Sequence, residues 1–122
     1  MAASKADPMV AMEQIEDIAR RIVLEFDPLR VILFGSHADG RSTEASDVDL
    51  LVVLPFEGGG FRKSLEILNR IDVRLPIDLI ARRPEDVERR YALGDPLIRE
   101  ALDRGRVLYE RTGPGMDRQG RG

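Results

Sequence analysis

One stretch of the sequence, residues 31–54, constrains the fold more than any other because it reads VILFGSHADGRSTEASDVDLLVVL. It contains two apolar runs of strand length, joined by a turn at Gly35 and a polar loop. Asp47 and Asp49 stand at the start of the second run. Alternate side chains of a strand share a face, so these carboxylates point the same way, with their Cα atoms roughly 7 Å apart. At the mouth of a buried strand they repel each other and lose hydration, and a divalent cation such as magnesium relieves both costs.

Composition limits the classes of protein to which the chain can belong. The 122 residues suffice for one domain with one core, and 43% hydrophobic with 34% charged residues is typical of a soluble globular protein. The formal net charge of −3 gives no support to nucleic-acid binding, so we expect no direct nucleic-acid partner. The absence of cysteine excludes disulfides and zinc–cysteine sites. No apolar run approaches membrane-spanning length and the N-terminus lacks a signal-peptide pattern, so we expect a cytoplasmic protein with no membrane partner.

Helical and strand patterns alternate along the chain, which predicts an α/β fold with a small central sheet. The flanking segments, residues 1–6 and 112–122, are polar and glycine-rich or lack periodicity, so we expect them to be flexible or disordered tails around a single domain over residues 7–111. Apolar spacing, caps and prolines place the elements of this domain. We expect helices over residues 8–26, 61–72, 84–94 and 96–104, and strands over residues 30–34, 48–54, 77–81 and 106–110.

Three aspartates fall inside or at the ends of the predicted strands. They are Asp47, Asp49 and Asp78. Strands are depleted in aspartate, and a buried carboxylate costs several kcal/mol unless it is paired or bound to metal. For Asp78 alone, a surface-facing position on a half-exposed sheet explains the sequence about as well as a functional role. For Asp47 and Asp49 together with the glycine turn, metal binding is the favoured interpretation.

The spacing around these carboxylates resembles a known signature. Gly35-Ser36, ten residues and then Asp47-Val48-Asp49 match the GS-x10-DxD motif of the DNA polymerase β-like nucleotidyltransferase superfamily. The size and layout are similar to its smallest members, the MNT-type minimal nucleotidyltransferases, which are usually antitoxins encoded beside a HEPN-domain toxin. The resemblance implies the minimal nucleotidyltransferase fold, a small mixed sheet with helices packed mainly on one face and the carboxylates on the other.

The resemblance also implies roles for individual residues. Gly35 would let the backbone approach the phosphates of ATP, and Ser36 would offer its hydroxyl and amide to the β and γ phosphates. Asp47 and Asp49 would hold two Mg²⁺ ions. Asp78 would bind the catalytic metal and help to deprotonate the attacking hydroxyl.

The connecting loop departs from the family pattern at one position. Many relatives carry an arginine where this chain has Asp39, and a carboxylate there would repel phosphate. Arg41 lies two residues further on and could replace that arginine, although a solvated loop arginine explains it equally well. We expect Arg41 and Ser46 to contribute to nucleotide binding.

Three functions are compatible with this sequence. The first is a metal-dependent protein adenylyltransferase that moves AMP from ATP to a protein hydroxyl, by resemblance a tyrosine of a HEPN toxin, and so acts as an antitoxin. The second is a non-catalytic antitoxin that neutralises the toxin by binding. The third, nucleotidyl transfer to a small-molecule hydroxyl, is disfavoured because enzymes of that kind use an additional helical domain.

Overall fold

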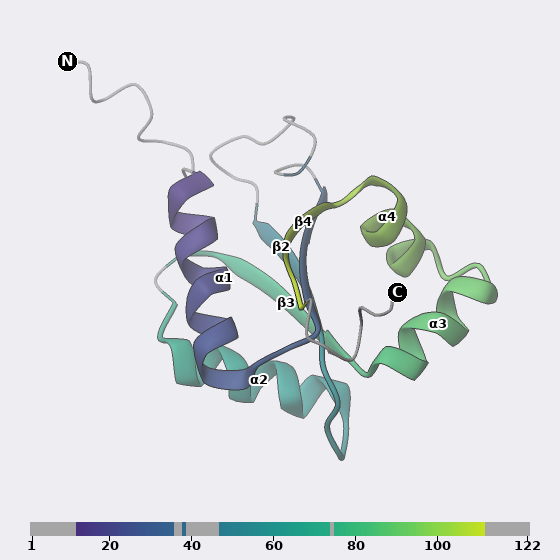
Figure 1. Ribbon diagram of the computed structural model, residues 1–122, viewed down its shortest axis with the longest axis horizontal. Coiled ribbons are helices and arrows are strands. Elements are labelled where there is room, and N and C mark those ends of the chain that lie inside the picture. The colour runs from purple at the N-terminus through teal and green to yellow at the C-terminus, as the bar shows by residue number, and fades with distance from the viewer. Residues whose placement is uncertain (1–11, 36–37, 39–46, 74, 112–122) are drawn as a thin grey trace.

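Four helices and four strands make up the described part of the chain (Figure 1). The computed structural model describes residues 12–35, 38, 47–73 and 75–111. The elements are α1 (Met12–Phe26), β1 (Arg30–Phe34), β2 (Val48–Val53), α2 (Gly60–Ile71), β3 (Ile77–Arg82), α3 (Pro84–Ala92), α4 (Pro96–Arg104) and β4 (Arg106–Glu110). Each corresponds to a predicted element. The predicted start of the first helix and both predicted tails lie outside the described residues. None of the described helices has the length and apolar character needed to cross a bilayer.

The four strands form one mixed sheet in the order β3-β2-β1-β4. β1 pairs antiparallel with both β2 and β4, whereas β2 pairs parallel with β3. A parallel pair needs a crossover, and α2 provides it between β2 and β3. The α/β class and the mixed sheet predicted from sequence are therefore confirmed.

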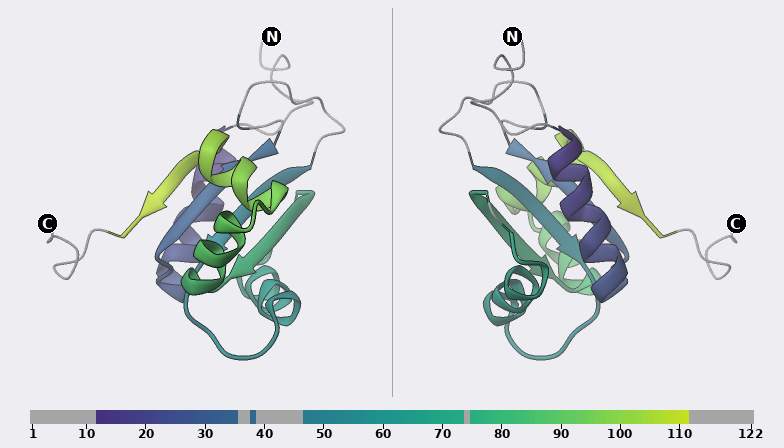
Figure 2. Two further views of the ribbon diagram at one scale, coloured as in Figure 1. Left: turned by 90° about the vertical axis from the view of Figure 1, so that its right-hand side faces the viewer. Right: turned by 90° about the vertical axis from the view of Figure 1, so that its left-hand side faces the viewer.

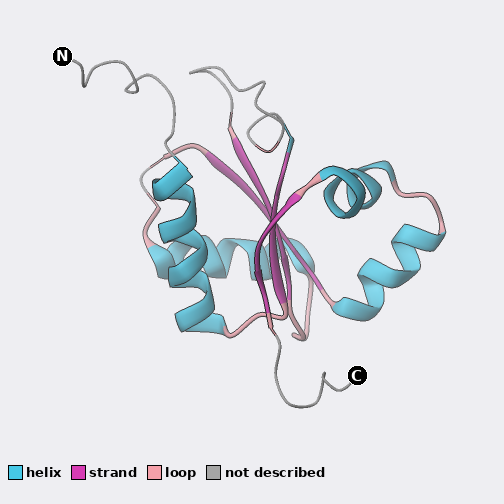
Figure 3. Cartoon of the chain, turned by 45° about the horizontal axis from the view of Figure 1, so that its top comes forward, coloured by secondary structure: helices cyan, strands magenta, loops and turns pink. Residues whose placement is uncertain are grey.

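The helices cover both faces of the sheet, which corrects the prediction that they pack mainly on one face (Figure 3). Ile15, Ile22 and Ile67 of α1 and α2 are buried on one side, whereas Val87 and Ile98 of α3 and α4 are buried on the other. The physical reason lies in the two central strands. Their apolar runs do not alternate with polar residues, so both faces of β1 and β2 must be shielded from water.

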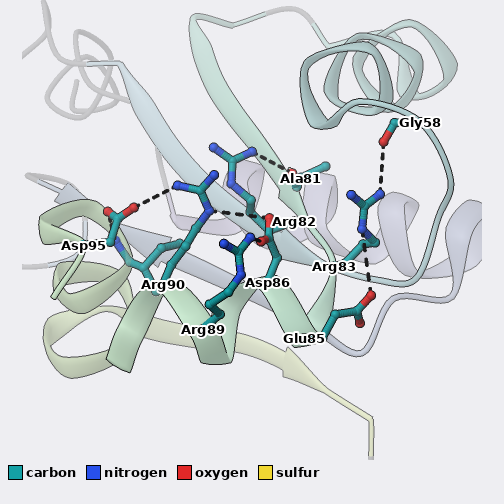
Figure 4. A network of polar contacts seen from close by, with 10 residues as sticks. Gly58, Ala81, Arg82, Arg83, Glu85, Asp86, Arg89, Arg90 and Asp95 are labelled. Atoms are coloured by element: carbon teal, nitrogen blue, oxygen red, sulfur yellow. Dashed lines mark hydrogen bonds and ion pairs between the residues drawn. The ribbon is translucent and has the colours of Figure 1, made fainter. Parts of the chain in front are cut away.

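Two arginines of the β3–α3 region hold neighbouring backbone in place (Figure 4). Arg83 donates from Nη1 to the carbonyl oxygens of Phe56 and Gly58, at 3.2 and 3.0 Å, and its guanidinium lies 4.9 Å from the centroid of the Phe56 ring. Arg82 donates from Nη1 to the Ala81 carbonyl at 3.0 Å. The glycine-rich connection before α2 is therefore hydrogen-bonded to Arg83, the residue that follows β3.

Asp95 is the N-cap of α4 and directly precedes Pro96, the first residue of the helix. Its Oδ1 accepts hydrogen bonds from the amides of Leu97 at 3.0 Å and Ile98 at 3.2 Å, and its Oδ2 lies 3.1 Å from Nη1 of Arg90 (Figure 4). The Ile98 amide, followed by Arg90 and the Leu97 amide, lowers the pKa of Asp95 despite the opposing effect of burial. The ionised carboxylate thus stabilises the junction between α3 and α4.

We expect Asp95→Ala to lower the free energy of unfolding by about 1 kcal/mol at neutral pH, because α4 loses its N-cap. Asp95→Asn keeps a capping oxygen but not the charge, so it isolates the ionic part. Because folding lowers the pKa of Asp95, the stability that its charge contributes is fully present above the pKa of the unfolded state. That contribution is lost as the pH falls through the pKa of the folded state. Urea midpoints of the wild type and Asp95→Asn should therefore converge in acid. A difference that stayed constant down to acid pH would contradict this account.

Candidate active site

Asp49 and Asp78 lie directly opposite each other on neighbouring parallel strands. Paired residues of this kind have Cα atoms about 4.8 Å apart and side chains on the same face. The neighbours Val48, Leu50 and Leu79 pack into the core beneath α1 and α2. By alternation, the two carboxylates therefore point to the opposite face, the one on which α3 and α4 lie.

The pair stands at the open end of that face. Asp49 is half-buried and Asp78 is exposed. Both residues lie in the second position of their strands, close to the point where β1 leaves the sheet and β2 enters it (Figure 2). Phe34, the last residue of β1, pairs with Asp49 across the antiparallel ladder. The two carboxylates therefore lie on β2 and β3, with β1 beside them, and β4 lies on the far side of β1.

Gly35 fits against the carboxylate of Asp49 in a way that no other residue could. Its φ angle of +79° lies in the left-handed region that favours glycine. A Cβ atom built on Gly35 would overlap Oδ2 of Asp49 and lie 3.3 Å from its Cγ. The carbonyl of Gly35, directly after β1, also accepts a hydrogen bond from the Ala38 amide at 3.1 Å. The glycine therefore brings the turn backbone against the acidic side chain.

Of the remaining predicted site residues, the structure describes only Asp47. Asp47 is exposed and directly precedes β2. Ser36, Arg41 and Ser46 lie outside the described residues, as does Asp39. Among the residues that are described, no group of three or more His, Cys, Asp or Glu side chains is close enough to hold a metal ion. What the described fold brings together is the Asp49–Asp78 pair, with Gly35 packed against Asp49, and carboxylate oxygens are ligands that suit a hard divalent cation such as magnesium.

A groove beside Asp78 was not predicted from the sequence. It has a volume of about 310 Å³ and runs between α2 and β3. Phe61 and Leu65 of α2 line this groove, and their exposed fractions are 79% and 45%. The buried face of α2 is formed instead by Ser64, Ile67 and Ile71, so Phe61 and Leu65 lie beside that face at the edge of the sheet.

Comparison with known proteins places this geometry in a family. The family model described as nucleotidyltransferase domain matches residues 12–108, which span every described strand and helix up to the middle of β4. No curated protein sequence matches the chain.

Solved structures share the fold at low sequence identity. A candidate nucleotidyltransferase from Sulfolobus solfataricus is 22% identical, with a TM-score of 0.58 over 81% of this chain and 79% of that one. A toxin–antitoxin structure with AMP-PNP is 17% identical, with a TM-score of 0.53 over 79% of this chain and 73% of that one. A mutant of the toxin–antitoxin MntA-HpeT is 13% identical, with a TM-score of 0.51 over the same shares of the two chains.

At these identities the structural neighbours show the fold, whereas the family model covers most of the sequence itself. The match runs through the strands that carry Asp49 and Asp78 and through the turn at Gly35. This chain therefore belongs to the nucleotidyltransferase domain family.

Proposed function

We propose that this protein is a metal-dependent nucleotidyltransferase that transfers AMP from ATP to a protein hydroxyl. The observation that carries the proposal is the register of β2 and β3, which sets Asp49 beside Asp78 on one face. Asp47 and Asp49 would hold two Mg²⁺ ions with Asp78 as the third carboxylate. Such ions, when bound, neutralise the triphosphate and stabilise both the entering and the leaving oxygen of an in-line displacement.

The reaction is an exchange of one phosphorus–oxygen bond for another. The acceptor hydroxyl oxygen forms a bond to the α-phosphorus, and the bond from that phosphorus to the oxygen bridging to the β-phosphate breaks. Pyrophosphate leaves with that bonding pair. Asp78 would take the proton of the acceptor hydroxyl and pass it to solvent, a role that its exposed position permits.

The turn after β1 would bind the phosphates. Gly35 has no side chain, so the backbone there lies directly against Asp49, and phosphates bound at this turn would lie beside the metal ions that the carboxylate would hold. Ser36, Arg41 and Ser46 would supply the hydroxyl, amide and guanidinium donors of the same site. Most of the rate would come from positioning and charge neutralisation rather than from covalent participation of the protein.

We propose a tyrosine of a HEPN-type toxin as the acceptor, which makes the protein an antitoxin. Two fold neighbours support this choice, since both are toxin–antitoxin structures and one is described with AMP-PNP. The other is a mutant in which two aspartates, two positions apart, are replaced by glutamate. Asp47 and Asp49 have that same spacing. The competing function, neutralisation by binding alone, predicts that the carboxylates are dispensable.

The double substitution Asp47→Asn/Asp49→Asn should reduce labelling of the toxin from α-labelled ATP by a factor of about 10² to 10³ or more, because the charge that would hold the metals is removed. The matched control is Asp27→Asn/Asp72→Asn. It makes the same change in charge at two left-handed positions, with φ of 49° and 55°, where asparagine is well tolerated.

Wild-type labelling by the Asp47/Asp49 variant would refute the catalytic assignment. Full neutralisation of the toxin in cells by a variant that no longer labels it would favour binding alone.

Gly35→Ala tests the close approach of the turn to Asp49. The added Cβ would displace that carboxylate, so we expect magnesium-dependent ATP binding to weaken by about tenfold or more. Gly94→Ala is the control, because Gly94 has a similar φ of +86° but an added Cβ there would meet no atom within 4 Å. Calorimetry with a non-hydrolysable ATP analogue measures both. Equal loss of affinity in the two variants would show that backbone strain, not the contact with Asp49, is responsible.

A further inference from the structure

The outer edge of β3 is free of strand pairing in the part of the chain that the structure describes. The Arg82 carbonyl accepts a hydrogen bond from the residue that follows β2, at 3.1 Å, so the backbone groups of Arg82 face inward. The amide of the preceding residue, Ala81, instead donates outward to Oγ of Ser64 on α2, at 3.0 Å. Alternation then turns the backbone groups of Ile77 and Leu79 outward as well, where no strand meets them.

The groove between α2 and this edge is lined mainly by apolar side chains, and its polar lining residues are Ser64, Asp78 and Arg82. Phe61, Leu65 and Leu68 line it from the helix, and Ile80 lines it from the strand. Asp78 contributes to the same lining. An aromatic side chain that is 79% exposed beside an unpaired strand edge is typical of a surface that another chain covers. Figure 2 shows α2 and β3 side by side at this border of the sheet.

The chemistry of the groove indicates which kind of molecule it would bind. A strand edge recognises an extended backbone, and apolar pockets beside it recognise every second side chain of that backbone. A nucleotide offers no such repeat of amide and carbonyl groups. Because Asp78 is both part of the groove and the proposed proton acceptor, an extended segment in the groove would carry its hydroxyl to the reacting end.

We propose that the groove between α2 and β3 docks the acceptor protein, by adding an extended segment of it to the outer edge of β3. The segment would pair with the backbone of Ile77 and Leu79, place alternate apolar side chains against Phe61 and Leu65, and present a tyrosine hydroxyl beside Asp78. This inference rests on the proposed function, since it names how the acceptor of that reaction is bound.

The test uses short peptides with one central tyrosine and apolar residues at every second position. The control peptide has the same composition with the apolar residues rearranged to helical spacing. Binding to the full chain is measured by fluorescence anisotropy. Phe61→Ser should weaken binding of the alternating peptide by about tenfold, because it removes the exposed aromatic wall. Leu24→Ser is the matched control, since Leu24 of α1 is also 79% exposed but does not line the groove.

Amide hydrogen exchange supplies a second readout that does not depend on a variant. Binding of the alternating peptide should slow exchange at Ile77 and Leu79 and leave β4, the opposite edge strand, unchanged. Equal affinity of wild type and Phe61→Ser, or equal binding of both peptides, would overturn the proposal. So would concentration-dependent dimerisation that Phe61→Ser abolishes, because the groove would then belong to a second copy.

Failure of this inference can be told apart from failure of the proposed function. Peptide docking does not require the metal-binding carboxylates, so Asp47→Asn/Asp49→Asn should bind the alternating peptide as tightly as the wild type. If the docking proposal is wrong, the wild type still labels its acceptor and Phe61→Ser labels it equally well. If the proposed function is wrong, Asp47→Asn/Asp49→Asn labels the acceptor as strongly as the wild type does. That result is independent of the affinity measured for the peptides.

Discussion

The parallel pairing of β2 with β3 is the constraint on which the rest of this structure depends. It alone brings Asp49 and Asp78, 29 positions apart in the chain, into direct opposition. A shift of one residue in this register would send Asp78 to the face beneath α1 and α2, among buried apolar side chains. The crossover through α2 fixes the register, because the buried side chains of Ile67 and Ile71 lock the helix onto the sheet.

The central strands stabilise the fold at the same place where they position the carboxylates. Val48, Leu50 and Leu51 are completely buried, so the start of β2 is anchored on both faces. The half-buried Asp49 sits within that anchored segment, where partial burial removes part of the hydration of its carboxylate. Gly35 completes the arrangement from the neighbouring strand by leaving room for the carboxylate. The packing that buries the start of β2 therefore also fixes the position of Asp49.

Much of this fold could be predicted from the sequence because its signals are local. Helical stripes, proline caps and short apolar runs mark each element, and Asp95 begins its helix as its capping pattern indicates. The position of the helices was predicted wrongly, although the unbroken apolar runs around Ile32 and Leu51 carried the information that both faces are buried. The contact between Gly35 and Asp49 could not be foreseen, since it depends on the long-range pairing of β1 with β2. The exposure of Phe61 depends likewise on where α2 meets the sheet edge.

The central claim is that carboxylates from two parallel strands share one divalent cation site. Paramagnetic Mn²⁺, titrated with a non-hydrolysable ATP analogue, tests it most directly through broadening of backbone amide resonances. If the two strands share the site, broadening at the lowest Mn²⁺ concentration should be strongest for the amides of residues 47–49 and of Asp78, and should weaken along β2 and β3 toward Val53 and Arg82. Broadening centred on other surface acids, with residues 47–49 and Asp78 affected no more than the far ends of their strands, would contradict it.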